Sequence, residues 1–215
     1  MYAKKTSAKK IAVLLLAVVL LIGGTVGGTL AWLSAQTNEV TNTFAVGKIE
    51  ITLTETFNAK SDDTLTTNDK WVGKIVPGGT EAKDPTVTVK AGSEKCYVYA
   101  LVENNMKIDG VVVVTPNISA NEWEAIGTNG NKTLYRYIGT NADANNVVNA
   151  ASADVKCEVF TQVTYDGGKI DETNITALAA NTIIVDAYAH QAENTTQAVA
   201  NAEAIKHFGV TAINP

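Results

Sequence analysis

Only two histidines and two cysteines occur in this chain of 215 residues, and they are the first candidates for chemistry. His190 and His207 belong to no H-E-x-x-H pair and have no zinc-ligand spacing from a cysteine. We expect His207 to pack against a helix or cap its carbonyl end, and His190 to end a strand. The sequence contains no Gly-x-Ser-x-Gly motif, phosphate-binding glycine loop or Ser/His/Asp order. It therefore predicts no catalytic residue, no metal ligand and no cofactor, and we expect the protein not to be an enzyme.

The two cysteines, Cys96 and Cys157, fall on the aliphatic faces of two expected strands, as they would in a shared core. In an exported protein they can form a disulfide bond. Such a bond would close a loop of about 60 residues and stabilise the fold by roughly 4 kcal/mol in the chain-entropy model. Two free buried thiols are the alternative, and the sequence leaves both open.

One acidic loop resembles half of a calcium-binding loop through Asp62, Asp63, Asn68 and Asp69. The EF-hand spacing and its terminal glutamate are absent. We therefore expect a solvated loop at these residues.

The formal net charge of -5 combines 17 basic with 22 acidic residues, and the basic ones are unevenly distributed. Four lysines lie in the first ten positions, and residues 1–31 contain no acid. Without that segment, 13 basic and 22 acidic residues remain, which is a net charge of -9 over 184 residues. This acidic remainder argues against a nucleic-acid-binding protein, which needs a clustered basic face.

The N-terminus has the order of an export signal, with lysines first, then an apolar run and then small residues. The run Ile11–Ile22 makes about 18 Å of helix, well short of the roughly 30 Å hydrocarbon core of a membrane. Glycines follow it, and Thr29 and Ala31 are small residues at the -3 and -1 positions of a peptidase site. We expect a signal peptide over 1–31, cleaved between Ala31 and Trp32. The alternative is an uncleaved anchor, the only way in which we expect this chain to contact a membrane.

From Ala45 onward, apolar and polar residues alternate with the period of a strand. In 95–104, Cys96, Val98, Ala100 and Val102 share one face while Tyr97, Tyr99 and Leu101 share the other, so we expect a central strand covered on both sides. The other expected strands are 49–54, 86–90, 111–115, 134–138, 155–165 and 183–190.

Two segments favour helix. Ile175–Ala180 is expected to form one turn, and Thr195–Phe208 a helix that ends at Gly209. The apolar stripe of the second is expected to be Val199, Ala202, Ile205 and Phe208. Turn signals separate the strands at 77–79, 109–110, 129–130 and 166–168. The pattern predicts an all-β fold, a jelly-roll-like antiparallel β-sandwich over 48–215 with one or two short peripheral helices. A helical signal peptide and an extended arm, residues 32–47, precede it.

Two N-terminal segments resemble a known family. Residues 27–34 read GGTLAWLS and residues 41–51 read TNTFAVGKIEI. They are similar to the SipW-type signal peptide and mature N-terminus of the TasA/camelysin family, exported proteins of Gram-positive bacteria. Further on, 75–79, 84–87 and 187–193 resemble later segments of the family, whereas Ala35 stands where Asp is common, and the Trp often found in the last helix is missing. The matching N-terminal positions are Asn42, Phe44, Gly47, Ile49, Ile51, Leu53 and Glu55.

The resemblance implies a jelly-roll protein of the extracellular or biofilm matrix or cell surface, processed by a type I signal peptidase of the SipW type and able to polymerise with itself. Some relatives carry a metalloprotease label, but this sequence lacks the ligands for such chemistry.

The arm suggests how copies could join after cleavage. It carries the apolar residues Trp32, Leu33, Val40, Phe44 and Val46 among Thr and Asn residues. A strand of this kind can add to a sheet edge or groove of a neighbour, and head-to-tail addition gives a filament. Alternatively the arm pairs within its own sandwich as the first strand. A different class of function is a monomeric secreted adhesion module that binds glycans or proteins through its Trp and Tyr residues, although these aromatics are more typical of a core.

Overall fold

The computed structural model describes residues 12, 15–16, 47–55, 64–65, 71–72 and 75–213, and everything below concerns these residues. The chain forms two compact units, Met1–Ala45 and Val46–Pro215. In the first unit Ala12, Leu15 and Leu16 are helical. Within the described part of the chain, no helix is long and apolar enough to cross a membrane.

Several expectations lie outside the described residues. These are the cleavage site between Ala31 and Trp32, and the acidic positions Asp62, Asp63, Asn68 and Asp69. The arm also lies outside them, except for its last residue, Gly47; its undescribed apolar residues are Trp32, Leu33, Val40, Phe44 and Val46.

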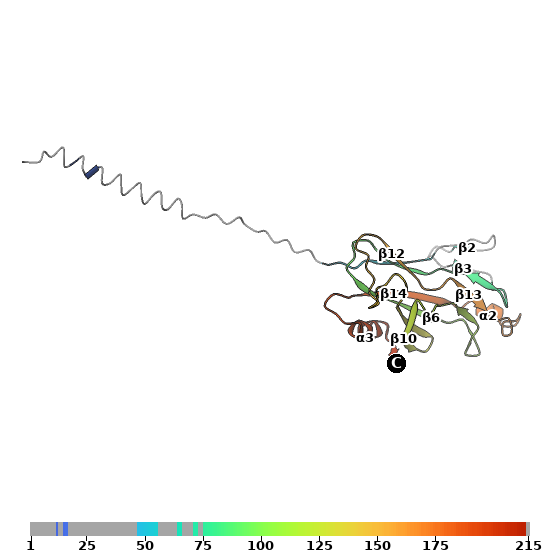
Figure 1. Ribbon diagram of the computed structural model, residues 1–215. Helices are drawn as coiled ribbons and strands as arrows, with labels where there is room; N and C mark the ends of the chain where they lie inside the picture. Colours follow the sequence, from blue (N-terminus) through green and yellow to red (C-terminus); the bar gives the residue numbers. More distant parts are fainter. Residues whose placement is uncertain are drawn as a thin grey trace, which may run out of the picture. The chain divides into compact units, whose positions relative to one another are not determined.

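The second unit is built from antiparallel strands, as the alternating pattern predicts. One layer is the five-stranded sheet β14-β6-β11-β10-β15. Facing it are two three-stranded sheets, β1-β5-β12 and β4-β13-β9, and two small hairpins, β2-β3 and β7-β8, complete the unit. The strands are β1 (Ile51–Thr54), β2 (Thr64–Leu65), β3 (Trp71–Val72), β4 (Thr80–Ala82), β5 (Thr86–Val89), β6 (Cys96–Asn104), β7 (Lys107–Ile108), β8 (Val111–Val112), β9 (Val114–Pro116), β10 (Trp123–Asn129), β11 (Lys132–Tyr137), β12 (Val155–Glu158), β13 (Gln162–Tyr165), β14 (Ile183–Gln191) and β15 (Thr211–Ala212). This arrangement confirms the all-β sandwich (Figure 1).

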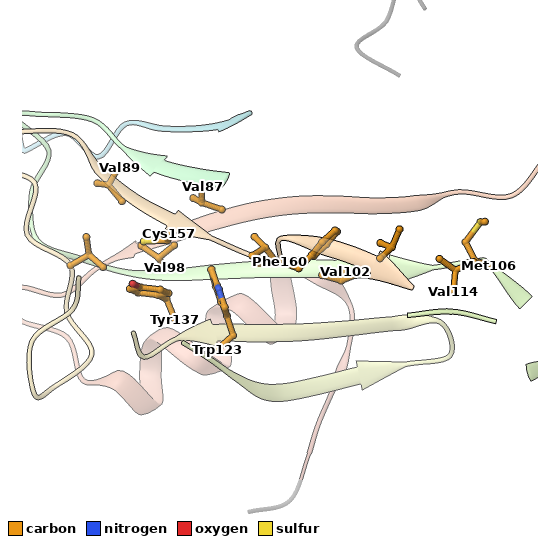
Figure 2. Packing of buried hydrophobic residues seen from close by; sticks show 14 of the residues in the cluster. Val87, Val89, Val98, Val102, Met106, Val114, Trp123, Tyr137, Cys157 and Phe160 are labelled. Carbon is orange, nitrogen blue, oxygen red and sulfur yellow. The ribbon is translucent and has the colours of Figure 1, made fainter. Parts of the chain in front are cut away.

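Strand β6 is the centre of the fold, and both of its faces are buried as its two apolar sets predict. Cys96, Val98, Ala100 and Val102 belong to the main core between the layers. Figure 2 shows side chains of this core in a row between strands of the two layers, among them Val87, Cys157, Trp123 and Tyr137. Trp123 also joins the layers by a hydrogen bond, because its Nε1 donates to the carbonyl oxygen of Glu158 at 2.7 Å.

The other face of β6 carries Tyr97, Tyr99 and Leu101 and is covered by helix α3 (Gln197–Phe208), which lies beside β10 in Figure 1. The side chain of Thr196 accepts a hydrogen bond from the Val199 amide, and Gly209 ends the helix with a φ of 63°. The predicted helix is therefore confirmed, within two residues at its start. A single turn, α2 (Ile175–Leu178), is also present where it is expected.

The predicted apolar stripe of α3 is confirmed for Ile205 and Phe208 and wrong for Val199 and Ala202. Val199 is 53% exposed and Ala202 is exposed, whereas Ala200 and Ala204 are fully buried, with Ile205 and Phe208 packed beside them. Small residues face the sheet because the tyrosines beneath them are large. A bulky residue at Ala200 or Ala204 would hold the helix away from that layer.

The single strand expected over 155–165 is two strands. Residues Val155–Glu158 form β12 in one three-stranded sheet, and Gln162–Tyr165 form β13 in the other. The partner segment is interrupted at the same level, between β4 and β5, by Asp84 and Pro85. Because proline has no amide hydrogen to donate, the ladder breaks on both sides.

Candidate strand-acceptor groove

The two histidines lie around one half-buried aromatic side chain rather than in a polar site. His207, on α3, stacks on Tyr188 of β14 with ring centroids 4.7 Å apart, and His190 lies 6.3 Å from the same ring. The Nδ1 atom of His190 is 2.9 Å from its neighbour's carbonyl oxygen, that of Gln191. These contacts are those of packing residues. No group of three or more His, Cys, Asp and Glu side chains among the described residues could hold a metal ion.

Cys96 and Cys157 lie in the same core cluster, both with no exposed surface, and both are free thiols. Burial raises the pKa of Cys96 to about 11. Burial, together with the neighbouring Cys96, raises the pKa of Cys157 to about 12. Thiols with such pKa values stay protonated at neutral pH and are poor nucleophiles, so their role here is packing.

The candidate binding site of this fold is an open groove of about 460 Å³ between the two layers. Its floor is the inner face of β6, β11 and β10, and its wall is β9. The apolar part of the lining comes from side chains of several strands and a loop: Val102, Val112, Pro116, Ile118, Ala120, Trp123, Ala125 and Tyr135. We call this feature the β9–β10 groove.

The groove exists because the facing layer is one strand short beside β9. Strand β9 pairs with β13 on one side only and is an edge of its sheet. The five-stranded sheet opposite extends further, so Ala125 stays exposed and Tyr135 only partly buried although both point inward. A strand placed beside β9 would cover these side chains, as β12 and β13 cover the rest of the sheet.

The backbone of β9 is ready for such a strand. The Asn117 amide donates to the Gln162 carbonyl, and the Asp166 amide donates to the Val113 carbonyl. The Val113 carbonyl and the backbone groups of Thr115 and Asn117 therefore point at β13, whereas the Val113 amide donates to the Met106 carbonyl. The alternate residues Val114 and Pro116 point their backbone groups away from β13. Proline has no N–H, and the Val114 carbonyl accepts a hydrogen bond from Asn104 Nδ2 at 2.8 Å, so the outer edge of β9 offers the Val114 amide and the Pro116 carbonyl for pairing.

Strand β10 has a partly open edge as well. It pairs with β15 only at Gly127 and Thr128, next to a bulge between Ala125 and Gly127. The segment from Trp123 to Ala125 has β11 as its one strand partner within the described residues. The Trp123 amide donates to the Ser119 carbonyl at 2.9 Å, so two partly open edges flank the same groove.

One end of the groove is polar. Lys107 donates a hydrogen bond to the side-chain oxygen of Asn131, and Asn131 Nδ2 donates to Asn105 Oδ1 at 2.9 Å. Asn105 Nδ2 in turn donates to Glu103 Oε1 at 3.2 Å. The groove is thus apolar along β10 and β11 and hydrogen-bonding at its β7 end, which would favour one direction and register of an inserted strand.

Sequence reasoning did not find this groove. Its residues come from six strands and two loops, and none has a type that stands out. The one available signal is Ala125, a small residue at a position where the alternation of β10 predicts a larger apolar one.

Searches of protein-family models, curated proteins and solved structures gave no match to this chain.

Proposed function

We propose that this protein is a secreted structural protein whose copies join into extracellular fibres. In this proposal, the arm of one copy, residues 32–47, inserts into the β9–β10 groove of the next. The observation that carries it is the absence of a described strand beside β9, which leaves a partly unpaired backbone edge and apolar inner side chains together.

The arm has the pattern that such a site requires. Val40, Asn42, Phe44 and Val46 alternate with Thr41, Thr43 and Ala45, so one face of an extended arm carries apolar groups and a single amide. That face matches a groove whose floor is apolar and whose end carries Lys107 and Asn131. Burial of the apolar face is the driving force, and main-chain bonds to β9 fix the direction.

A neighbour's arm fits better than the chain's own. The arm leads directly into β1, which lies against β14, whereas the floor of the groove runs over β6, β11 and β10. At about 4.8 Å per strand, the arm would have to cross about 5–14 Å of its own sandwich to lie along this floor. Insertion into the next copy needs no such crossing, and because each copy both gives and receives a strand, the chain of contacts does not close.

We further propose membership of the TasA/camelysin family on the sequence resemblance. Export by the signal peptide and cleavage after Ala31 by a SipW-type peptidase would release the arm. The product would reach the extracellular matrix or surface of a Gram-positive bacterium.

The experiment compares two chains by electron microscopy and sedimentation. The mature chain, residues 32–215, should form filaments, and a chain that begins at Ala45 should stay monomeric because it lacks the inserted strand. Equal polymerisation of the two would refute insertion of the arm. A mature chain that stays monomeric would favour the monomeric adhesion module instead.

A groove variant tests the receiving side. Ala125→Arg places a long charged side chain on the groove floor and should abolish filaments while leaving the fold intact, since Ala125 is exposed. Gln162→Arg is the matched control, because Gln162 is an exposed strand residue outside the groove. Filaments should persist in the control. If both variants polymerise like the parent chain, the arm binds elsewhere.

A further inference from the structure

The longest edge strand of the described sheets is β14, with nine residues, all of them paired with β6. The Ala192 amide donates to the Lys95 carbonyl just beyond this ladder. Counting from that pair, residues 184, 186, 188 and 190 point their backbone groups at β6. Val185, Ala187 and Ala189 therefore point theirs outward, where no further strand of this sheet is described.

An outward row of amides on a long apolar strand is a template for another strand. The central amide of this row is already occupied, because Asp186 Oδ1 accepts a hydrogen bond from the Ala187 N–H at 2.7 Å. Asp186 is exposed, so its charge remains hydrated while the oxygen covers the edge. An acceptor oxygen at this place removes the donor that the middle of a new strand ladder would need.

We infer that Asp186 is a gatekeeper that keeps β14 from pairing with β14 of a second copy. The second copy is the fitting partner because antiparallel pairing about Ala187 is self-complementary. It would set Val185 opposite Ala189 and Asp186 opposite Tyr188, and every partner contact would occur twice. Asp186 lies at the centre of this two-fold arrangement, where its oxygen occupies the Ala187 amide that would form the middle hydrogen bonds.

The inference is independent of the arm and of the β9–β10 groove. It states that β14 is a second interaction surface, closed in the native chain. The contrast with β9 is physical: Asp186 covers an outward amide of β14, whereas the side chains around β9 leave the Val114 amide without such a carboxylate in the described contacts.

Removal of the acceptor oxygen tests the inference. In the mature chain, Asp186→Ala frees the Ala187 amide, and β14 should then pair between copies. Hydrogen exchange of peptides covering β14 is the readout, because it reports on this edge in monomers and in filaments alike. Exchange of the outward amides should slow about tenfold or more as protein concentration rises, and sedimentation should detect additional association relative to the parent.

Two matched variants separate the gatekeeper from a general surface effect. Asp186→Asn keeps an acceptor oxygen and should behave like the parent chain. Asp186→Ala combined with Ala187→Pro removes the outward N–H, with no loss to the β6 ladder, and should reverse the association. Unchanged exchange and sedimentation in Asp186→Ala would overturn the inference. Association of Asp186→Asn equal to that of Asp186→Ala would also overturn it, since charge alone would then be responsible.

Discussion

Two glycine-containing turns pack closely against each other in this sandwich, and replacing one glycine tests this contact. The turn at 77–79 leads into β4, and the turn at 166–168 follows β13, the strand that pairs with β4. A Cβ atom on Gly167 would lie 2.9 Å from both the Cα and the amide nitrogen of Gly78. The opposing atoms are backbone, so Gly167→Ala can be accommodated only if one of the two turns moves.

The expected cost follows from that distance. Contacts under 3.0 Å to backbone are essentially never tolerated, so Gly167→Ala should destabilise the fold by about 1–3 kcal/mol, the usual range for overpacking. Gly168→Ala is the matched control, because its added Cβ would have its nearest contact at 3.4 Å, with Asp166 Oδ1, and its backbone has no positive φ. The control should be neutral or stabilising by up to about 1 kcal/mol, since alanine restricts the unfolded chain.

Urea unfolding of the two variants and the parent measures this difference, with midpoints converted by a common slope. Thermal unfolding should show the same order, with Gly167→Ala lower by about 2–12 °C for a domain of this size. Equal midpoints for Gly167→Ala and Gly168→Ala would refute the close backbone contact between the two turns.

Three further predictions concern the buried core. Neither thiol should react with a thiol reagent in the folded protein at pH 8, and two should react per chain after denaturation without reductant; none reacting would establish a Cys96–Cys157 bond. Burial raises the pKa of Cys157 from 9.0 to about 12, so the folded state keeps a proton that the unfolded chain loses. The free energy of unfolding should therefore fall as pH rises from about 9 toward 12. This fall should be smaller in Cys157→Ala. The ring centroids of Trp123 and Tyr137 are 5.0 Å apart, and Trp123→Phe keeps an aromatic ring beside Tyr137 but leaves the Glu158 carbonyl without its donor. Urea unfolding of this variant should show a loss of about 1–3 kcal/mol in the free energy of unfolding. An unchanged midpoint would contradict the hydrogen bond between the layers.

The strands could be predicted because their signal is local. The two apolar sets of β6 follow directly from alternation along ten residues, and both are buried as expected. The start and end of α3 could also be predicted, since Thr196 and Gly209 act within one turn of the helix ends.

The errors share a cause, which is dependence on a distant partner. Residues 155–165 alternate without interruption, yet the ladder breaks because Pro85 lies in the facing segment. In α3 the centre of the buried face is formed by Ala200 and Ala204 rather than by Val199. The large tyrosines of β6 and β14 determine this face, because only small residues permit close approach there.

The β9–β10 groove could not be predicted either, because it too depends on segments that are distant in the sequence. A groove is the space left by a strand that is missing, and a missing strand has no residues in the sequence of the sheet that lacks it. The sequence does contain a candidate for the missing strand. This is an arm with strand alternation at Val40, Asn42, Phe44 and Val46 that precedes the first strand of the described sandwich. In the proposed function, the arm supplies the strand that the groove lacks. The β14 edge covered by Asp186 would add specificity to such an assembly, because a subunit that polymerises at one edge gains from having its longest described edge closed.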